Sequence, residues 1–175
     1  MKRDELRTDR LPNALLGHEA RSSSDDHAAL RVWLRLLACT TDIETEIRRR
    51  LRSRFRVSLA RFDYMAQLYR CPDGLKMGDL TQHLMVTGGS VTNLTDELER
   101  DGLVVRTSNP SDRRTWTVGL TGPGRKAFEA MAKEHEQWIL ELFGSLDERS
   151  LKNLHTELGR LRLHLSQIQR GPRAD

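Results

Sequence analysis

The chain has 175 residues, of which 37% are hydrophobic and 31% charged, a balance typical of one soluble, helix-rich protein with its own core. The formal net charge is +4 and the sequence pI is about 9.4, which fits nucleic-acid binding without proving it. No window approaches the ~20 apolar residues of a membrane span, and the N-terminus lacks the apolar stretch of a secretory signal.

Residues 1–26 lack apolar periodicity and mix both charge signs, which predicts a mobile N-terminal arm. The first predicted helix runs from His27 to about Phe55, with Asp25 or Asp26 as its N-cap. It would be about 42 Å long at 1.5 Å per residue. One small domain does not bury so long an apolar stripe, so we expect contacts with several elements, including a second copy of the chain. The stripe comprises Leu30, Trp33, Leu34, Leu37, Ile43, Ile47, Leu51 and Phe55.

All the basic residues in and just after the first predicted helix, apart from histidine, are arginines. From Arg31 to Arg61 there are nine arginines and no lysine. Arginine is preferred for bidentate contacts to phosphate and carboxylate, so the pattern fits an anion-binding surface. A solvated helix face explains the same pattern equally well.

A second helix is predicted over residues 58–70, with Ser58 as its N-cap, and the Pro72-Asp73-Gly74 segment ends it. Two shorter helices follow, over residues 76–84 and 88–100, and a bend joins them at residues 85–87. The second short helix places Val91, Leu94 and Leu98 on an inward face and small polar residues on the other. This pattern predicts a helix-turn-helix.

A β-hairpin is predicted directly after the helix-turn-helix. An Asp101-Gly102 turn leads into the apolar residues 103–105, and a second, alternating run covers residues 115–120. The polar segment between the runs carries Arg113 and Arg114, which we expect at the tip of the hairpin. A hairpin in this position is a wing, and the whole is a winged helix-turn-helix.

Two more helices complete the chain. Thr121 caps the first, with Pro123 in its first turn, Gly144-Ser145 interrupts the pattern, and Asp147 starts the last helix. Apolar residues in the last helix repeat at alternating spacings of three and four, which is typical of a seam for another helix. We expect a two-fold dimer built from both chain ends. The predicted interface residues are Leu151, Leu154, Leu158, Leu161, Leu165 and Ile168.

Residues 98–106, together with Asp112, Arg114, Leu120 and Thr121, resemble the MarR family of winged helix-turn-helix regulators. The spacing of these four residues matches the Asp-x-Arg-x5-Leu-Thr motif of that family, and the resemblance covers roughly residues 27–168. It implies a mainly α-helical fold with a small β-hairpin wing. Residues 27–57 and 122–170 would supply the dimerisation helices, and residues 58–121 the DNA-binding lobe.

The N-terminal half of the helix over residues 88–100 is the predicted reader of the major groove, which admits an α-helix. Its first N–H groups and its dipole favour phosphate, and its short side chains suit base edges. The predicted contacts are Thr87, Gly88, Gly89, Ser90, Thr92 and Asn93, and ordinary helix solubility is the alternative for each. The acidic residues Asp96, Glu97 and Glu99 oppose DNA binding unless they lie away from the groove or pair with local arginines.

The wing is the predicted second reader. The resemblance implies that Arg114 enters the minor groove and that Asp112 holds the tip through an ion pair. A narrow minor groove attracts guanidinium groups by its negative potential, although Arg113 and Arg114 could instead contact only phosphates. A dimer would then read a palindromic operator with half-sites about one helical turn apart.

The resemblance also implies a repressor that a small ligand releases from DNA. Residues 30–37 and 61–68 are similar to regulators of aromatic-acid (hydroxycinnamate or benzoate) catabolism, so we expect an aromatic acid or an aromatic acyl-CoA thioester as effector. Arginines near the pocket would hold its carboxylate or phosphates. The candidate ligand-binding residues are Trp33, Leu37, Arg48, Arg49, Arg52, Phe62, Tyr64, Met65 and Tyr69, and a place in the core is the alternative for the aromatic ones.

Other functions have less support. Cys39 and Cys71 lie far apart, which favours a reducing cytoplasm, and a peroxide sensor at either one would need a depressed thiol pKa. The six histidines lack metal-ligand spacing, and no Ser/His/Asp or Cys/His set converges. Gly88-Gly89 lacks the lysine of a phosphate-binding loop. We therefore expect no enzyme activity, no metal and no cofactor.

Overall fold

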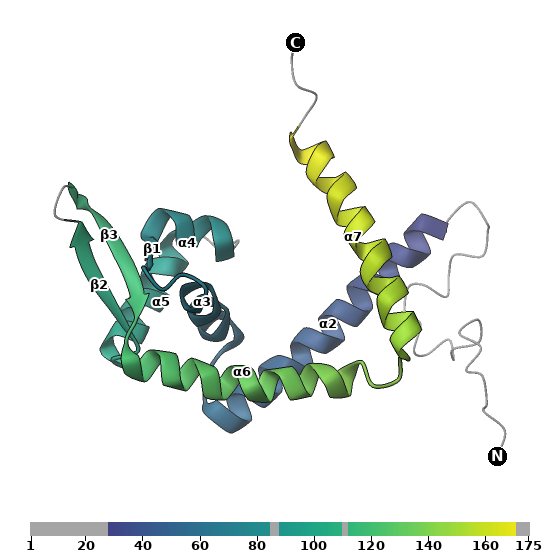
Figure 1. Ribbon diagram of the computed structural model, residues 1–175, viewed down its shortest axis with the longest axis horizontal. Coiled ribbons are helices and arrows are strands. Elements are labelled where there is room, and N and C mark those ends of the chain that lie inside the picture. The colour runs from purple at the N-terminus through teal and green to yellow at the C-terminus, as the bar shows by residue number, and fades with distance from the viewer. Residues whose placement is uncertain (1–27, 85–87, 110–111, 171–175) are drawn as a thin grey trace, which may run out of the picture. The chain divides into compact units, whose positions relative to one another are not determined.

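The computed structural model describes residues 28–84, 88–109 and 112–170 (Figure 1). The chain divides into two compact units, one ending at Met131 and the other beginning at Ala132, so helix α6 belongs to both. The first unit contains α2 (Ala28–Phe55), α3 (Leu59–Tyr69), β1 (Leu75–Lys76), α4 (Met77–Leu84), α5 (Gly88–Arg100), β2 (Val104–Asn109), β3 (Asp112–Leu120) and the first part of α6 (Gly122–Leu142). The second contains the rest of α6 and α7 (Glu148–Arg170). In the described residues, no helix is both long and apolar enough to cross a membrane.

The helices begin where their predicted caps lie. Each of three capping side chains accepts a hydrogen bond from the backbone N–H three residues later: Ser58 at 3.3 Å, Thr121 at 3.0 Å and Asp147 at 2.8 Å. These bonds satisfy N–H groups that have no partner within the first turn of a helix. The predicted cap of α2, Asp25 or Asp26, lies outside the described residues, as do the arm over residues 1–26 and the bend at 85–87.

The predicted hairpin is confirmed, and the structure adds a third strand. β2 and β3 pair antiparallel, and β1 pairs with the other edge of β3, so the order is β1-β3-β2. The sequence pattern missed β1 because a two-residue strand shows no alternation. Gly74, with φ 83°, turns the chain into β1. A Cβ on Gly74 would lie 2.7 Å from the carbonyl oxygen of Val118, so glycine is required there.

The core of the first unit joins its helices to the sheet. α3 and α4 contact β3, while α5 contacts β2. Because α3 and α5 also contact each other, the helix-turn-helix and the wing share one apolar core. Its buried members include Phe62, Tyr64, Met65, Leu68, Leu80, Val91, Leu98, Val104, Val118 and Phe128.

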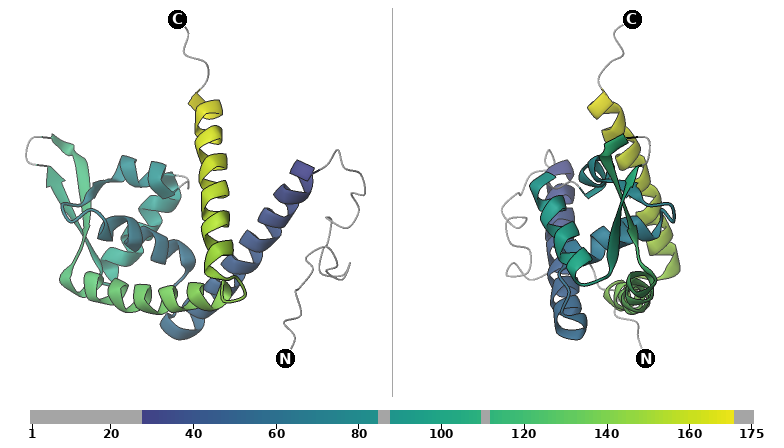
Figure 2. Two further views of the ribbon diagram at one scale, coloured as in Figure 1. Left: turned by 45° about the vertical axis from the view of Figure 1, so that its right-hand side comes forward. Right: turned by 90° about the vertical axis from the view of Figure 1, so that its left-hand side faces the viewer.

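Helix α7 of the second unit is one uninterrupted helix (Figure 2). Its predicted seam is exposed along its whole length, from 37% at Leu154 to 62% at Ile168. Leu163, also 62% exposed, falls on the opposite side of the helix by its spacing. The described α7 therefore carries a continuous stripe of exposed apolar side chains.

Candidate nucleic-acid interface

The two faces of α5 differ as predicted. Val91 and Leu98 are buried, at 1% and 0% exposure, whereas the side chains of Thr92 and Asn93 are exposed. A helix with one face in the core and short polar side chains on the other can offer that polar face to a macromolecular partner without disturbing its packing.

The N-terminus of α5 carries most of the other predicted contacts. Gly88, Gly89 and Ser90 form its first residues, and Thr87 lies outside the described residues. The backbone N–H groups of such a first turn have no intrahelical acceptor, and the helix dipole adds positive potential. This end of α5 is therefore suited to an anionic oxygen.

A Schellman motif ends α5. The N–H of Gly102, with φ 70°, donates to the Glu99 carbonyl at 2.9 Å, and the N–H of Leu103 donates to the Leu98 carbonyl at 2.9 Å. The left-handed conformation of Gly102 turns the chain sharply into β2. The Asp101-Gly102 pair that predicted this turn therefore connects the helix directly to the wing.

A buried hydrogen bond joins α5 to α3. The hydroxyls of Tyr64 and Thr95 lie 2.5 Å apart, and both residues are fully buried. Thr95 Oγ1 donates to the Val91 carbonyl at 2.7 Å, which leaves Tyr64 as the donor to Thr95. Burial raises the pKa of Tyr64, and the hydrogen bond with Thr95 partly opposes this shift.

An ionic cluster joins α5 to β2. The guanidinium of Arg106 donates to Glu99 at 2.9 Å and to Asp96, and its backbone N–H donates to Glu99 at 3.2 Å. The hydrogen bond to Asp96 is the main reason that the pKa of Arg106 is raised. Two of the three acidic residues that seemed to oppose DNA binding thus pair with a local arginine, as the sequence allowed. Glu97 is exposed.

The wing differs from its sequence prediction in one respect. Asp112, Arg113 and Arg114 open strand β3 and do not form the loop, because Asp112 pairs with Asn109. The register shifts between Ser108 and Asn109, so the ladder continues past an irregularity that the sequence pattern did not reveal. The loop itself, residues 110–111, lies outside the described part of the chain.

The Leu-Thr end of the motif has a structural role. Thr121 donates its hydroxyl to the Gly102 carbonyl at 2.7 Å while it caps α6, so it fastens the end of β3 to the end of α5. Gly124 packs directly against this junction: a Cβ there would lie 1.9 Å from the Leu103 carbonyl oxygen. The base of the wing is therefore held closely between α5 and α6.

A helix-turn-helix with an attached wing is the fold of many DNA-binding regulators. Comparison with known proteins identifies the family to which this chain belongs. The MarR family model matches residues 57–116. A MarR family transcriptional regulator from Silicibacter pomeroyi is 30% identical, and its crystal structure aligns over 82% of this chain and 99% of that one, with a TM-score of 0.69. This chain belongs to the MarR family.

Two further proteins are similar to this chain. The HTH-type transcriptional regulator YdgJ of Bacillus subtilis is 28% identical over 113 residues, which are 65% of this chain and 68% of YdgJ. The structure of MepR from S. aureus in complex with DNA shares the fold, with a TM-score of 0.65 and 23% identity, and covers 82% of this chain and 99% of that one.

As a MarR family member, the chain is a DNA-binding transcriptional regulator, and the family and its neighbours are regulators rather than enzymes. These relatives do not support the narrower resemblance to aromatic-acid regulators, nor a redox role for Cys39 or Cys71. Cys39 is exposed on α2 and Cys71 half-buried after α3. In the described residues, no group of three histidine, cysteine or acidic side chains could hold a metal ion.

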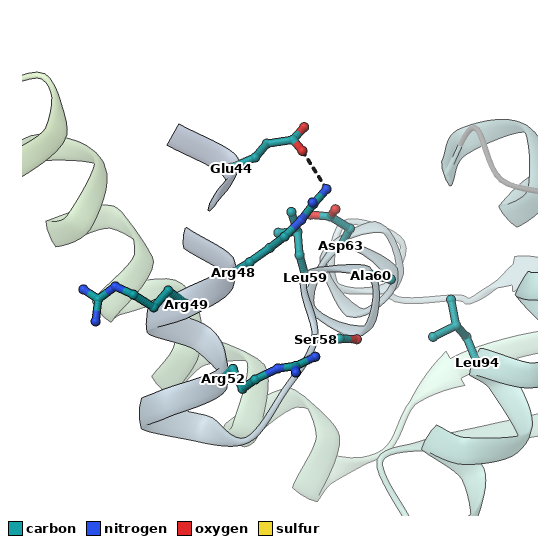
Figure 3. Close-up of a pocket in the computed structure, with 9 residues that line it drawn as sticks. All are labelled: Glu44, Arg48, Arg49, Arg52, Ser58, Leu59, Ala60, Asp63 and Leu94. Carbon is teal, nitrogen blue, oxygen red and sulfur yellow. Dashed lines mark hydrogen bonds and ion pairs between the residues drawn. The ribbon is translucent and has the colours of Figure 1, made fainter. Parts of the chain in front are cut away.

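The candidate effector residues separate into two groups in this MarR-type fold. Arg48, Arg49 and Arg52 line a hollow of about 610 Å³ between α2, α3 and α5, together with Glu44, Ser58, Leu59, Ala60, Asp63 and Leu94. In Figure 3, Arg48 reaches toward Glu44, its ion-pair partner at 2.7 Å, and Arg49 points away from α3. Arg49 pairs with Glu46 at 2.7 Å, and Arg49 and Arg50 together lower the pKa of Glu46 to about 2.

The aromatic candidates do not line this hollow. Phe62, Tyr64 and Met65 are buried in the core, the alternative that the sequence analysis had kept open. The Tyr69 ring packs against Phe128 at a tilt of 40°, with ring centroids 4.9 Å apart, and the Tyr69 hydroxyl donates to Glu129 at 3.0 Å. Trp33 and Leu37 are exposed on α2, at 57% and 48%.

Sequence reasoning missed two arginines that hold α5 and its C-terminal end to neighbouring elements. Arg106 appeared only as part of the family run, and Arg61, which pairs with Asp101 at the end of α5, received no role. A signal for Arg106 was available, because acidic residues on the helix predicted to read DNA suggest a nearby cation that pairs with them. No local pattern indicated the contact between Arg61 and Asp101, which are 40 residues apart.

Proposed function

We propose that this MarR-type regulator is a homodimeric repressor that binds a palindromic operator and is released by a small aromatic ligand. The observation that carries the DNA-binding part is the exposed pair Thr92 and Asn93 on a helix whose other face is buried. Next to this helix is a hairpin with Arg113 and Arg114 at the start of its second strand, β3. Such an arrangement offers one element to each groove.

In this proposal α5 enters the major groove. Residues 87–90 contact phosphates through backbone N–H groups, and Thr92 and Asn93 reach base edges. Arg114 enters the adjacent minor groove, and Asp112 holds the distal end of the hairpin. MepR shares the fold and has been crystallised in complex with DNA, which supports DNA as the partner of this lobe.

The dimer would use both chain ends, residues 27–57 and 122–170, with residues 58–121 as the DNA-binding lobe. Its support is the α7 seam, in which all six apolar residues are at least 37% exposed in the single chain. Monomeric proteins rarely leave a long contiguous apolar surface in water. A second copy of the chain would cover the seam and place two copies of α5 about one helical turn of DNA apart.

The effector would bind in the hollow between α2 and α3. Its volume of about 610 Å³ suits a small organic ligand. Within the described residues, Arg52 lines the hollow and pairs with no carboxylate, so it is the proposed anchor for the ligand's carboxylate or, in an acyl-CoA, for a phosphate. Leu59 and Leu94 supply apolar contacts for an aromatic ring.

Gel shifts with the DNA upstream of the protein's own gene test the repressor. Wild type should shift this DNA in a salt-sensitive manner. Asn93→Ala should weaken the shift, and failure of wild type to bind would reject the proposal.

Thermal unfolding with benzoate, hydroxycinnamates and their CoA thioesters tests the effector. A ligand of the native state raises the melting temperature, and the same compound should release the DNA. Arg52→Ala should abolish the rise, whereas Arg70→Ala, at an exposed arginine that does not line the hollow, should keep it. No stabilisation by either class of compound would reject the aromatic pocket.

A further inference from the structure

Glu99 accepts two hydrogen bonds from Arg106, one on each carboxylate oxygen. One carboxylate oxygen of Glu99 accepts from the backbone N–H of Arg106 at 3.2 Å, and the other accepts from its guanidinium at 2.9 Å. The remaining guanidinium branch donates to Asp96, one turn earlier on the same face of α5. Arg106 is therefore fixed through both its main chain and its side chain, a geometry that the arginine fork allows. We call these three residues the wing clamp.

The wing clamp sits where the hairpin leaves the core. Val104 and Val118, at 2% and 0% exposure, pack the base of the hairpin, and Arg106 pairs with Val118 across the ladder. Two residues further along, Ser108 pairs with Trp116, and both are exposed. Among the β2 residues whose side chains the structure describes, Arg106 is thus the last one that bonds to a side chain of α5.

We propose that the wing clamp fixes the direction of the hairpin relative to α5, so that Glu99, Asp96 and Arg106 act as positioning residues for the wing and not as DNA contacts. This inference rests on the proposed function, in which α5 and Arg114 read adjacent grooves. The affinity gained from binding both grooves is greatest when the separation of α5 and the wing is fixed before binding, because ordering a loose hairpin on DNA costs free energy.

The clamp also explains why a DNA-reading helix carries these carboxylates. Two negative charges near phosphates weaken binding by simple electrostatics. If charge alone mattered, removing Glu99 would strengthen DNA binding. The clamp predicts the opposite, because removing Glu99 releases both the main chain and one guanidinium branch of Arg106.

A matched pair of variants separates the two effects. Glu99→Ala and Glu97→Ala each remove one carboxylate from α5, and Glu97 is exposed, outside the clamp. We expect Glu99→Ala to weaken operator binding about tenfold. Glu97→Ala should leave it equal or slightly tighter. Equal effects of the two variants on affinity would overturn the proposal. Arg106→Lys, which keeps the charge and loses the fork, should behave like Glu99→Ala.

A cycle with Arg114→Ala tests whether the clamp acts through the wing. In that background the arginine proposed to enter the minor groove is absent, so Glu99→Ala should cause a smaller further loss of affinity than it does in wild type. A direct contact of the cluster with phosphate would instead give the same loss in both backgrounds, and this result would overturn the proposal.

Hydrogen exchange of the free protein provides a readout without DNA. Backbone amides of residues 105–108 should exchange faster in Glu99→Ala than in Glu97→Ala, while amides of α3 remain unchanged. Equal exchange in the two variants would overturn the clamp. If wild type failed to bind operator DNA while the exchange difference was present, the proposed function would fail and the clamp itself would stand.

Discussion

Tyr64 of α3 and Thr95 of α5 form a hydrogen bond inside the core, with their hydroxyls 2.5 Å apart and both residues fully buried. Thr95 also donates to the Val91 carbonyl at 2.7 Å, so a chain of two hydrogen bonds links the backbone of α5 to the Tyr64 side chain of α3. Apolar packing tolerates small rotations of a helix, whereas a hydrogen bond inside a dry core permits one rotation. The pair therefore restricts the rotation of α5 about its own axis, in addition to the packing of its apolar face.

Tyr64→Phe should lower the free energy of unfolding by about 0.5–1.5 kcal/mol, because Thr95 keeps its bond to Val91 and no cavity forms. Chemical denaturation measures this value. Tyr69→Phe removes a hydroxyl that bonds to Glu129 at the surface, so it should cost less. An equal loss in the two variants would contradict the role given to the Tyr64 hydroxyl.

Alkaline pH should destabilise the wild type through Tyr64. Its pKa in the folded protein is raised, mainly by burial, so above pH ~10 the unfolded state loses a proton that the folded state keeps. The stability contribution is therefore present below the unfolded pKa and is lost as pH rises through the folded pKa. Melting temperatures from pH ~8 to ~11 should fall more steeply for wild type than for Tyr64→Phe. Parallel curves would contradict this expectation.

Gly124→Ala should destabilise the protein by about 3 kcal/mol or more, because the new Cβ would lie 1.9 Å from the backbone oxygen of Leu103 and neither backbone can move freely. Gly122 lies in the same turn of α6 with open space around it, so Gly122→Ala is the matched control and should be near neutral. Thermal and chemical unfolding compare the two. A mild Gly124→Ala variant would show that the junction of wing and α6 is looser than described.

Leu158→Glu should convert the proposed dimer to monomer, because it places a charge in the centre of the α7 seam. Leu163→Glu introduces the same charge on the other side of the helix, at a residue that is 62% exposed, and should leave the dimer intact. Light scattering of the eluting protein distinguishes the species, since one chain has a mass of 20.1 kDa. A monomeric wild type, or a dimer that survives Leu158→Glu, would contradict the proposed interface.

The helices were predictable from the sequence because their signals are local. Ser58, Thr121 and Asp147 cap the helices that they were predicted to cap, and the buried face of α5 follows from the spacing of Val91 and Leu98. Local caps and periodicity determine where a helix begins and which face it buries.

The remaining features depend on contacts between distant residues. Strand β1 exists because Leu75 pairs with Val118, and Arg61 meets Asp101, which is 40 residues away. The aromatic side chains near Tyr64 were ambiguous for the same reason, since a pocket and a core show the same apolar periodicity in sequence. The pairing of Arg106 with two acidic residues was the exception, because the charge conflict on α5 was visible in advance.

The most direct test of the account is a titration of operator DNA against wild type, Asn93→Ala and Arg114→Ala at several salt concentrations. Wild type should bind with a dissociation constant in the range of about 10⁻⁸ M and with a steep salt dependence. Asn93→Ala should weaken operator binding by about 1–3 kcal/mol and relax sequence preference at one position, and Arg114→Ala should weaken binding by a similar amount and reduce the salt slope. Binding that is insensitive to salt, or that both variants leave unchanged, would contradict the winged helix-turn-helix as the reader of DNA.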